Sequence, residues 1–342
     1  MNPWADVPSA IRYPLSFAIP FGATFLLTPL AGKLAHRIGV LDRPASGAHK
    51  THVGVTPYLG GVAVTAGLLA IALLASGSNG ELATILACGG LLAALGLLDD
   101  IRGVSQFVRL AYEVVCGVAL WLIGIQAGVF HVGGVDLAIT VLWVVSVTNA
   151  VNFIDNMDGV AAGVAAASAL GIAGIAAWNG NFLVGSFGLA VAGASLGFLR
   201  YNFPPAKIFL GDAGSLLLGF LLAALTLKLD LPVGPAAPRA LTILLLAAVP
   251  LFDLSVVVLA RARRKAPPWT AGTDHTTHRL KERGWSPQRI TLTLAGAQAA
   301  CSAFASFLYL QADAVAYTGL VVGGVVWLVL LARFLRMPAA VS

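Results

Sequence analysis

The chain has 342 residues, of which 58% are hydrophobic and 11% are charged, and its formal net charge is +6. A soluble domain carries roughly twice that share of charged residues, so the composition excludes an ordinary soluble enzyme. Apolar runs of about 20 residues recur along the whole chain and predict membrane-spanning helices.

The apolar runs divide into eleven predicted spans. The span 82–98 is at the lower limit of about 17 residues for a membrane helix, so the count is ten or eleven. No soluble domain fits, because the longest polar stretch is 263–288. We therefore expect an all-α, polytopic membrane protein with a single domain over residues 1–342. The spans are 13–35, 57–77, 82–98, 107–127, 137–153, 160–178, 182–200, 213–230, 239–262, 289–311 and 315–335.

The distribution of lysine and arginine predicts the orientation in the membrane. Of the 21 such residues, 18 fall on one side of the predicted spans, and only Arg12, Lys228 and Arg239 fall on the other. Since cytoplasmic loops carry the excess of positive charge, we expect the N-terminus outside the cell and the C-terminus in the cytoplasm. Topology thereby explains the basic character of the chain, and no nucleic-acid partner is expected.

Aspartates gather at the predicted cytoplasmic ends of several spans, where basic residues should dominate. One such carboxylate is often only a solvated loop residue. Six in four separate elements are hard to explain in that way, because a buried carboxylate costs a few kcal/mol in a membrane. Clustered carboxylates that face basic loops indicate a divalent cation and an anionic substrate. The six are Asp99, Asp100, Asp155, Asp158, Asp212 and Asp253.

The stretch NAVNFIDNMDG, residues 149–159, shows a regular spacing of polar side chains. Asn149, Asn152, Asp155 and Asp158 recur every third residue, which places Asn152 and Asp155 next to each other on one face of a helix. Gly159 then permits a turn. Carboxylate and amide oxygens are hard ligands that suit Mg²⁺ or Mn²⁺, so we expect a metal site here.

The same stretch matches the N-x-x-N-x-x-D-x-x-D-G motif of the polyprenyl-phosphate N-acetylhexosamine-1-phosphate transferases, which include the phospho-MurNAc-pentapeptide translocase. Four further motifs stand in the family's order, and the resemblance spans nearly the whole chain. The aspartate in VPLFDLS (249–255) is more similar to the branch that transfers GlcNAc-1-phosphate to undecaprenyl phosphate. The four motifs are TPYLGG (56–61), LLDD (97–100), FLGDAGS (209–215) and DHTTHRL (274–280).

The resemblance implies an enzyme that moves a sugar-1-phosphate, expected to be GlcNAc-1-phosphate, from a UDP-N-acetylhexosamine to polyprenyl (undecaprenyl) phosphate. The implied cofactor is Mg²⁺, or Mn²⁺ in its place. The products would be UMP and a polyprenyl-diphosphate-sugar. They would form at the cytoplasmic face of the inner (plasma) membrane, as the first step of a cell-envelope glycan. The surrounding partner is membrane lipid. Whether the protein forms a homodimer is left open.

The site residues that the resemblance implies fall into three groups. Asp99, Asp100 and Asp155 are implied to be catalytic, although the need for a base stays open because a phosphate nucleophile is already largely ionised at neutral pH. Asn152 and Asp212 are implied to bind the metal. The implied substrate-binding residues are Asp158, Asn202, Phe209, His275, His278, Arg279, Lys50 and His52.

The chain departs from the family pattern at three positions. The family's last loop usually reads H-x-H-H, whereas Thr277 stands at the middle histidine here. The lysine and glutamine that are common early in the fourth span are Arg109 and Glu113. Because Thr277 is shorter than histidine and always neutral, we expect it to leave room beside the donor sugar and to make donor selection less strict.

Several alternatives stay open. Structural roles would also explain single residues, such as a helix cap for Asp212, membrane-facing packing for Phe209 and the cytoplasmic charge excess for Lys50. A proton- or ion-coupled transporter also keeps acids in membrane helices, but near the midplane. An intramembrane metalloprotease would need H-E-x-x-H, whereas HTTHR (275–279) lacks the glutamate.

Overall fold

The computed structural model describes residues 7–42, 55–75, 80–128, 132–229, 236–270, 272–311 and 313–337. Their elements in chain order are α1 (Ser9–Ile38), β1 (Leu41–Asp42), β2 (Thr56–Pro57), α2 (Gly60–Ala75), α3 (Gly80–Arg102), α4 (Gln106–Leu122), α5 (Gly133–Ile154), α6 (Val160–Trp178), α7 (Phe182–Asn202), α8 (Gly211–Leu227), α9 (Ala236–Leu246), α10 (Ala248–Arg263), α11 (Thr276–Glu282), α12 (Pro287–Tyr309) and α13 (Asp313–Arg336).

The predicted helical, multi-pass architecture is confirmed. Each of the eleven predicted spans coincides with one helix or, in one case, with two consecutive helices. Among the described residues, seven helices are long and apolar enough to cross a membrane, or eight if one bent pair counts as a single span. α2 and α8 are apolar but shorter. The count of ten or eleven spans and the orientation in the membrane stay predictions.

The ninth predicted span, 239–262, is not one straight helix. It consists of α9 and α10, which are separated at Ala247 and meet at an angle of 81°. Pro250 explains the break, because proline has no N–H to donate to the carbonyl of Leu246 and its ring would clash with that carbonyl in a continuous helix. The ninth predicted span therefore consists of two helices that meet at a bend, and Pro250 is the signal for that bend in the sequence.

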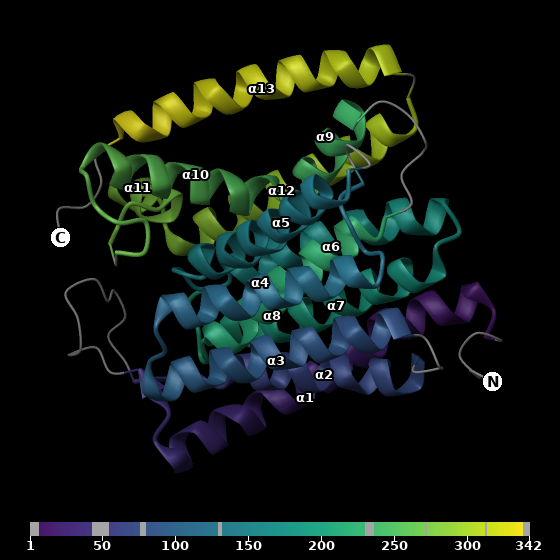
Figure 1. Ribbon diagram of the computed structural model, residues 1–342. Coiled ribbons are helices and arrows are strands. Elements are labelled where there is room, and N and C mark those ends of the chain that lie inside the picture. Colours follow the sequence, from purple (N-terminus) through teal and green to yellow (C-terminus); the bar gives the residue numbers. More distant parts are fainter. Residues whose placement is uncertain are drawn as a thin grey trace.

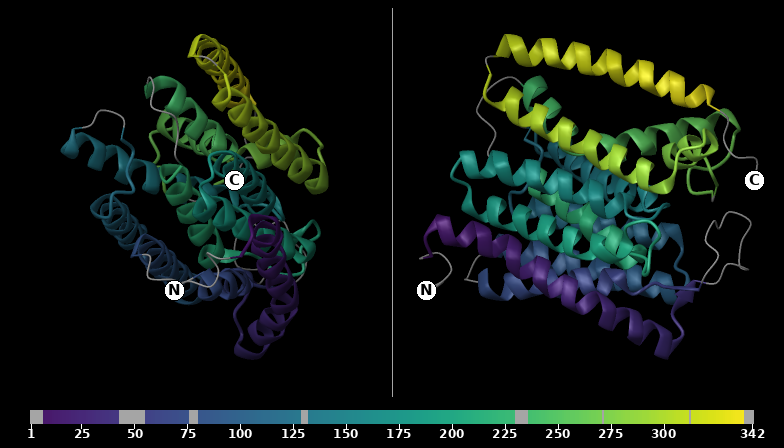
Figure 2. Two further views of the ribbon diagram at one scale, coloured as in Figure 1. Left: turned by 90° about the vertical axis from the view of Figure 1, so that its right-hand side faces the viewer. Right: turned by 180° about the vertical axis from the view of Figure 1, so that it is seen from behind.

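The helices run side by side, with α8 enclosed by its neighbours (Figure 1). α8 packs against α2, α3 and α5, and every one of its residues except Asp212 is buried. α1 and α13 lie at opposite edges of the bundle (Figures 1 and 2), where α1 covers α2 and α7, and α13 contacts α9 and α10. Asp212, the second residue of α8, is therefore the one residue of this enclosed helix that is not buried.

Three glycines let α2, α3 and α8 touch backbone to backbone beside Asp212. A Cβ at Gly61 would lie under 3.0 Å from the backbone of Gly214, and a Cβ at Gly96 would lie under 3.0 Å from the backbone of Asp212. Small residues at helix contacts are the usual means of close packing in a membrane, where the hydrophobic effect does not drive helices together. The backbone that carries Asp212 is thus held from two sides.

A short hairpin lies against the segment that leads into α8. β1 and β2 pair antiparallel, with Leu41 opposite Pro57. The N–H of Phe209 donates to the carbonyl of Pro57 at 2.9 Å, and the N–H of Gly60 donates to the carbonyl of Phe209 at 3.0 Å. The TPYLGG and FLGDAGS motifs, which are about 150 residues apart in the chain, therefore form one unit of structure.

Candidate active site

Arg109 bridges two of the predicted site aspartates. Its Nη1 lies 2.8 Å from Asp99 Oδ2 and 2.8 Å from Asp212 Oδ2. Asp99 lies near the end of α3, Arg109 near the start of α4 and Asp212 near the start of α8, so one side chain ties three helices together. The second oxygen of Asp99 accepts from the N–H of Val104 at 2.6 Å. Both side-chain oxygens of Asp99 are therefore held within the protein.

Asp100 caps the N-terminus of α8. Its two carboxylate oxygens accept from the N–H of Asp212 at 2.9 Å and from the N–H of Ala213 at 3.2 Å. The first N–H groups of a helix lack partners within it, and negative charge is stabilising at that end. Gly211 allows the close approach, because its φ is +72° and a Cβ there would lie 2.6 Å from Asp100 Oδ2. Asp100 thus orients the backbone of Asp212, a role that its motif did not indicate.

The two asparagines of the N-x-x-N motif face α4 and α8. Asn152 donates through Nδ2 to Asp212 Oδ1 at 2.7 Å and to Ser215 Oγ at 2.9 Å. Asn149, one turn earlier, donates through Nδ2 to Glu113 Oε2 of α4. The spacing of three therefore places both amides at helix contacts, where they fix how α5 sits against its neighbours.

Asp155 follows α5 as its C-terminal cap residue and does not continue the helix. Asn152 hydrogen-bonds to Asp212, and the charge of Asp212 also acts on Asp155, so both residues lie near the start of α8. Asp155 is half-buried, and its burial, followed by the charges of Asp212, Asp100 and Asp158, raises its pKa well above the ordinary value. Carboxylates that oppose each other's ionisation in this way are stabilised by a further cation.

The donor atoms suit Mg²⁺ or Mn²⁺ in kind. Asp212 offers carboxylate oxygen, and Asn152, which donates through its nitrogen, has its amide oxygen left to offer; both are hard ligands. Within the described residues, no three Asp, Glu, His or Cys side chains are grouped so as to hold a metal ion. The protein would therefore supply few ligands, which is usual for Mg²⁺ when substrate phosphates complete its shell.

Asp158 and Asn202 brace the loop between α7 and α8. Asp158 Oδ2 accepts from the N–H of Ala206 at 2.9 Å. Asn202 is 2% exposed; it accepts from the N–H of Gly159 at 2.9 Å and donates to the carbonyl of Ile208 at 2.9 Å. The side chains that the resemblance implies to bind the substrate thus form hydrogen bonds with main-chain groups here. Their role in substrate binding stays a prediction.

Phe209 forms an aromatic pair at the same end of the bundle. Its ring centre lies 5.6 Å from that of Tyr58, with the rings tilted by 58°. Tyr58 is hydrogen-bonded to Asp42 of β1. The TPYLGG motif contains Tyr58, but no charge or spacing singled it out in the sequence. The pair offers an aromatic surface beside the carboxylates.

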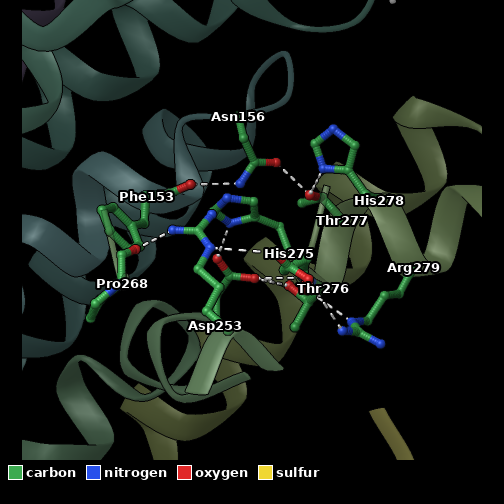
Figure 3. Close-up of polar contacts among 11 residues, drawn as sticks. Phe153, Asn156, Asp253, Pro268, His275, Thr276, Thr277, His278 and Arg279 are labelled. Carbon is green, nitrogen blue, oxygen red and sulfur yellow. Dashed lines mark hydrogen bonds and ion pairs between the residues drawn. The ribbon is translucent and has the colours of Figure 1, made fainter. Parts of the chain in front are cut away.

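Asp253 of α10 and the start of α11, with its cap residue His275, form the second half of the site (Figure 3). Asp253 is fully buried and accepts from His275 Nδ1 at 2.8 Å and from the N–H and hydroxyl of Thr276 at 2.7 and 2.6 Å. Holding Nδ1 fixes the imidazole ring and leaves Nε2 for another partner. The ring of His275 also lies edge-on to Phe153 of α5, at 6.0 Å.

Thr277 faces the protein interior. It is 0% exposed, its hydroxyl is hydrogen-bonded to the side chain of Asn156, and it lies 3.3 Å from His278 Nδ1 (Figure 3). Thr277 thus contacts Asn156, and the expectation that it leaves room beside the donor sugar stays a prediction. Burial, together with the charges of His275 and Lys281, lowers the pKa of His278 from 6.5 to about 4. His278 is thus a neutral imidazole near pH 7.

Arg279 of α11 points away from His278 (Figure 3). It is 3% exposed and donates to the carbonyls of Asp274 at 2.8 Å, Phe334 at 3.0 Å and Met337 at 2.5 Å. The last carbonyls of a helix lack partners within it, so Arg279 terminates α13. Its implied contact with a diphosphate stays a prediction.

The end of α5 joins the two halves of the site. Asn152 contacts Asp212 on the carboxylate side, whereas Phe153 and Asn156 contact His275 and Thr277 at the start of α11. Asn156 and Ser215 were missed in the sequence, because neither falls on the three-residue spacing or carries a charge. Lys50 and His52 lie outside the described residues.

Comparison with known proteins agrees with the motifs. The model of glycosyl transferase family 4 matches residues 82–230. A probable undecaprenyl-phosphate N-acetylglucosaminyl 1-phosphate transferase of Bacillus subtilis (strain 168) is 33% identical over 297 residues, which cover 83% of this chain and 81% of that protein. A decaprenyl-phosphate N-acetylglucosaminephosphotransferase of Mycobacterium leprae (strain TN) is 30% identical over 310 residues, or 79% of this chain and 77% of that protein. An undecaprenyl-phosphate alpha-N-acetylglucosaminyl 1-phosphate transferase of Escherichia coli (strain K12) is 27% identical over 296 residues, or 80% and 79%.

The apolar helices, the polar site at their ends and these likenesses define a multi-pass membrane transferase. The chain belongs to glycosyl transferase family 4. The transporter alternative is not favoured, because the family and the relatives are named as transferases, and Asp99, Asp100 and Asp212 make their contacts at helix ends.

Proposed function

We propose that this protein transfers GlcNAc-1-phosphate from UDP-GlcNAc to a polyprenyl phosphate and releases UMP. The observation that carries the proposal is the junction, across the end of α5, of a carboxylate cluster with a histidine-containing segment. The first suits a divalent cation, and the second suits phosphate and sugar oxygens. The names of the three relatives support the same donor group and the same class of acceptor.

Asp212 and Asn152 would hold Mg²⁺, or Mn²⁺, together with phosphate oxygens of the substrate. The bound ion would neutralise charge on the diphosphate. Phosphoryl transfer depends on alignment and neutralisation more than on covalent chemistry by the protein. Asp99 and Asp100 would contribute to this alignment, because Asp99 pairs with Arg109 and Asp100 accepts a hydrogen bond from the backbone of Asp212.

The remaining side chains would bind and orient the substrates. Asp155 lies where the charges of Asp212, Asp100 and Asp158 act on it, so it is the candidate to take a proton from the acceptor phosphate. His275 presents Nε2 to a phosphate or sugar oxygen, because Asp253 holds its Nδ1. His278, neutral near pH 7, would add a hydrogen bond without a charge.

We place the site at the cytoplasmic face of the inner (plasma) membrane, where a UDP-sugar is available. Helices α1, α3, α7, α10 and α13 all carry arginine in their last turn. Cytoplasmic ends of spans are the ones enriched in Lys and Arg. The product would be the first lipid-linked intermediate of a cell-envelope glycan.

Release of UMP by the detergent-solubilised full-length protein tests the proposal. UMP should appear only when UDP-GlcNAc, undecaprenyl phosphate and Mg²⁺ are all present. Asp212→Asn should reduce release to background, whereas Asp136→Asn, which removes a buried carboxylate at the other end of α5, should retain it. Release without the lipid acceptor, or full activity of Asp212→Asn, would contradict the assignment.

A further inference from the structure

Arg109 places its positive charge between two carboxylates, where a divalent cation would also be stabilised. Its Nη1 lies 2.8 Å from both Asp99 Oδ2 and Asp212 Oδ2. The other side-chain oxygen of Asp212 accepts from Asn152 at 2.7 Å. Both oxygens of this predicted metal ligand are therefore engaged within the protein, and a divalent cation that approaches Asp212 meets a guanidinium there.

A third carboxylate, that of Glu113, lies one turn after Arg109 on α4. Glu113 is 0% exposed; its Oε2 accepts from Asn149, while its Oε1 has no hydrogen-bond partner among the described residues. A buried carboxylate that lacks full pairing is costly. Residues four apart on a helix are neighbours, with about 5–6 Å between their Cβ atoms. A change of rotamer therefore brings the Arg109 guanidinium within reach of Glu113.

We infer that Arg109 exchanges between these carboxylates: it pairs with Asp99 and Asp212 when the divalent cation is absent, and with Glu113 when the cation is bound. The inference rests on the proposed function in one respect, namely that Asp212 is a ligand of the cation. Arg109 and Glu113 are then positioning residues that set the affinity of the site for the metal.

The exchange makes two opposite predictions for the two residues. Removing the charge of Arg109 should tighten binding of the cation, because a like charge no longer competes for Asp212. Removing the charge of Glu113 should weaken binding, because the displaced guanidinium loses its second partner. If Arg109 only supported the shape of the site, its loss would instead loosen Asp212 and weaken binding.

Binding of Mn²⁺, measured by EPR of the free ion with detergent-solubilised full-length protein and no substrate, tests this without turnover. We expect the Kd to fall about tenfold in Arg109→Gln and to rise about threefold in Glu113→Gln. The double variant should match Arg109→Gln, because Glu113 acts only through Arg109. Arg102→Gln, an exposed arginine in the last turn of α3, is the control for losing a nearby positive charge.

An equal or higher Kd in Arg109→Gln, with wild-type binding still dependent on Asp212, would overturn the exchange and leave the metal site in place. Mn²⁺ binding that is equal in Asp212→Asn and wild type would remove the metal site, and the exchange with it. Should Arg109→Gln fail to fold, Glu113→Gln decides alone, because an unchanged Kd there overturns the exchange.

Discussion

Asp100 allows a direct test of whether a motif aspartate acts on the substrate or on the fold. We predict that Asp100→Ala destabilises the protein, while Asp100→Asn keeps part of its stability and part of its activity. The carboxylate accepts from the first N–H groups of α8, at 2.9 and 3.2 Å. Alanine would leave both groups without this acceptor, whereas the single amide oxygen of asparagine would replace one of the two bonds.

The size of the effect follows from these two bonds. Loss of a helix cap costs about 0.5–2 kcal/mol, and a hydrogen bond to a charged group contributes about 1.5–3 kcal/mol. Because Asp100 is half-buried and one bond is long, we expect a loss of about 2–4 kcal/mol for Asp100→Ala and about half of that for Asp100→Asn.

The free energy of unfolding is measured by denaturant titration in detergent, followed by tryptophan fluorescence, with UMP release assayed on the same samples. Glu81→Gln is the matched control at the opposite end of α3, where Glu81 pairs with Lys228 at 2.8 Å and both side chains are partly exposed. Such a pair should contribute less than about 1 kcal/mol. An Asp100→Asn variant with wild-type stability and no activity would refute the cap, and would place Asp100 on the substrate.

Three further substitutions test other parts of the site. Arg279→Met removes the donor to the carbonyls at the end of α13, so stability should fall by about 1–3 kcal/mol with an unchanged KM for the UDP-sugar; a large rise in KM would place Arg279 at the diphosphate. Because the pKa of His278 falls to about 4 on folding, the unfolded chain takes up the proton first, and stability should be lost as the pH falls from 6.5 to about 4. His278→Gln should lessen that loss, and an identical pH profile would argue against burial of this ring. Thr277→His places a larger ring at a buried position, so it should cost about 1–3 kcal/mol without changing the ratio of UDP-GlcNAc to UDP-GalNAc turnover; a narrowed donor range would mean that position 277 does read the sugar.

Helix positions and the clustering of aspartates could be predicted from the sequence, because both depend on strong local signals. Apolar runs of span length locate the helices, and the motif acids stand at their ends. The break between α9 and α10 could also have been predicted. Pro250 cannot donate a hydrogen bond to the carbonyl of Leu246, so this proline indicates that the helix is interrupted here.

Partners that are far apart in the chain could not be predicted in the same way. Asp100 and the N–H that it caps are 112 residues apart, and nothing near Asp100 indicates which helix begins beside it. Arg279 binds main-chain carbonyls 55 and 58 residues later, and a carbonyl has no signature in the sequence. Thr277 is buried because Asn156 meets it from another helix end, so spacing within its own loop could not show this.

The contact of Gly61, Gly96 and Gly214 beneath Asp212 limits how this enzyme could be re-engineered. A library that varies side chains around the carboxylates has no room there, since any Cβ at these glycines meets a neighbouring backbone or a core side chain under 3.0 Å away. The start of α11 is held by side chains, and these can be exchanged in compensating pairs. Variation of the site therefore belongs at the start of α11 and at Asn156, while the three glycines should be left unchanged in every variant.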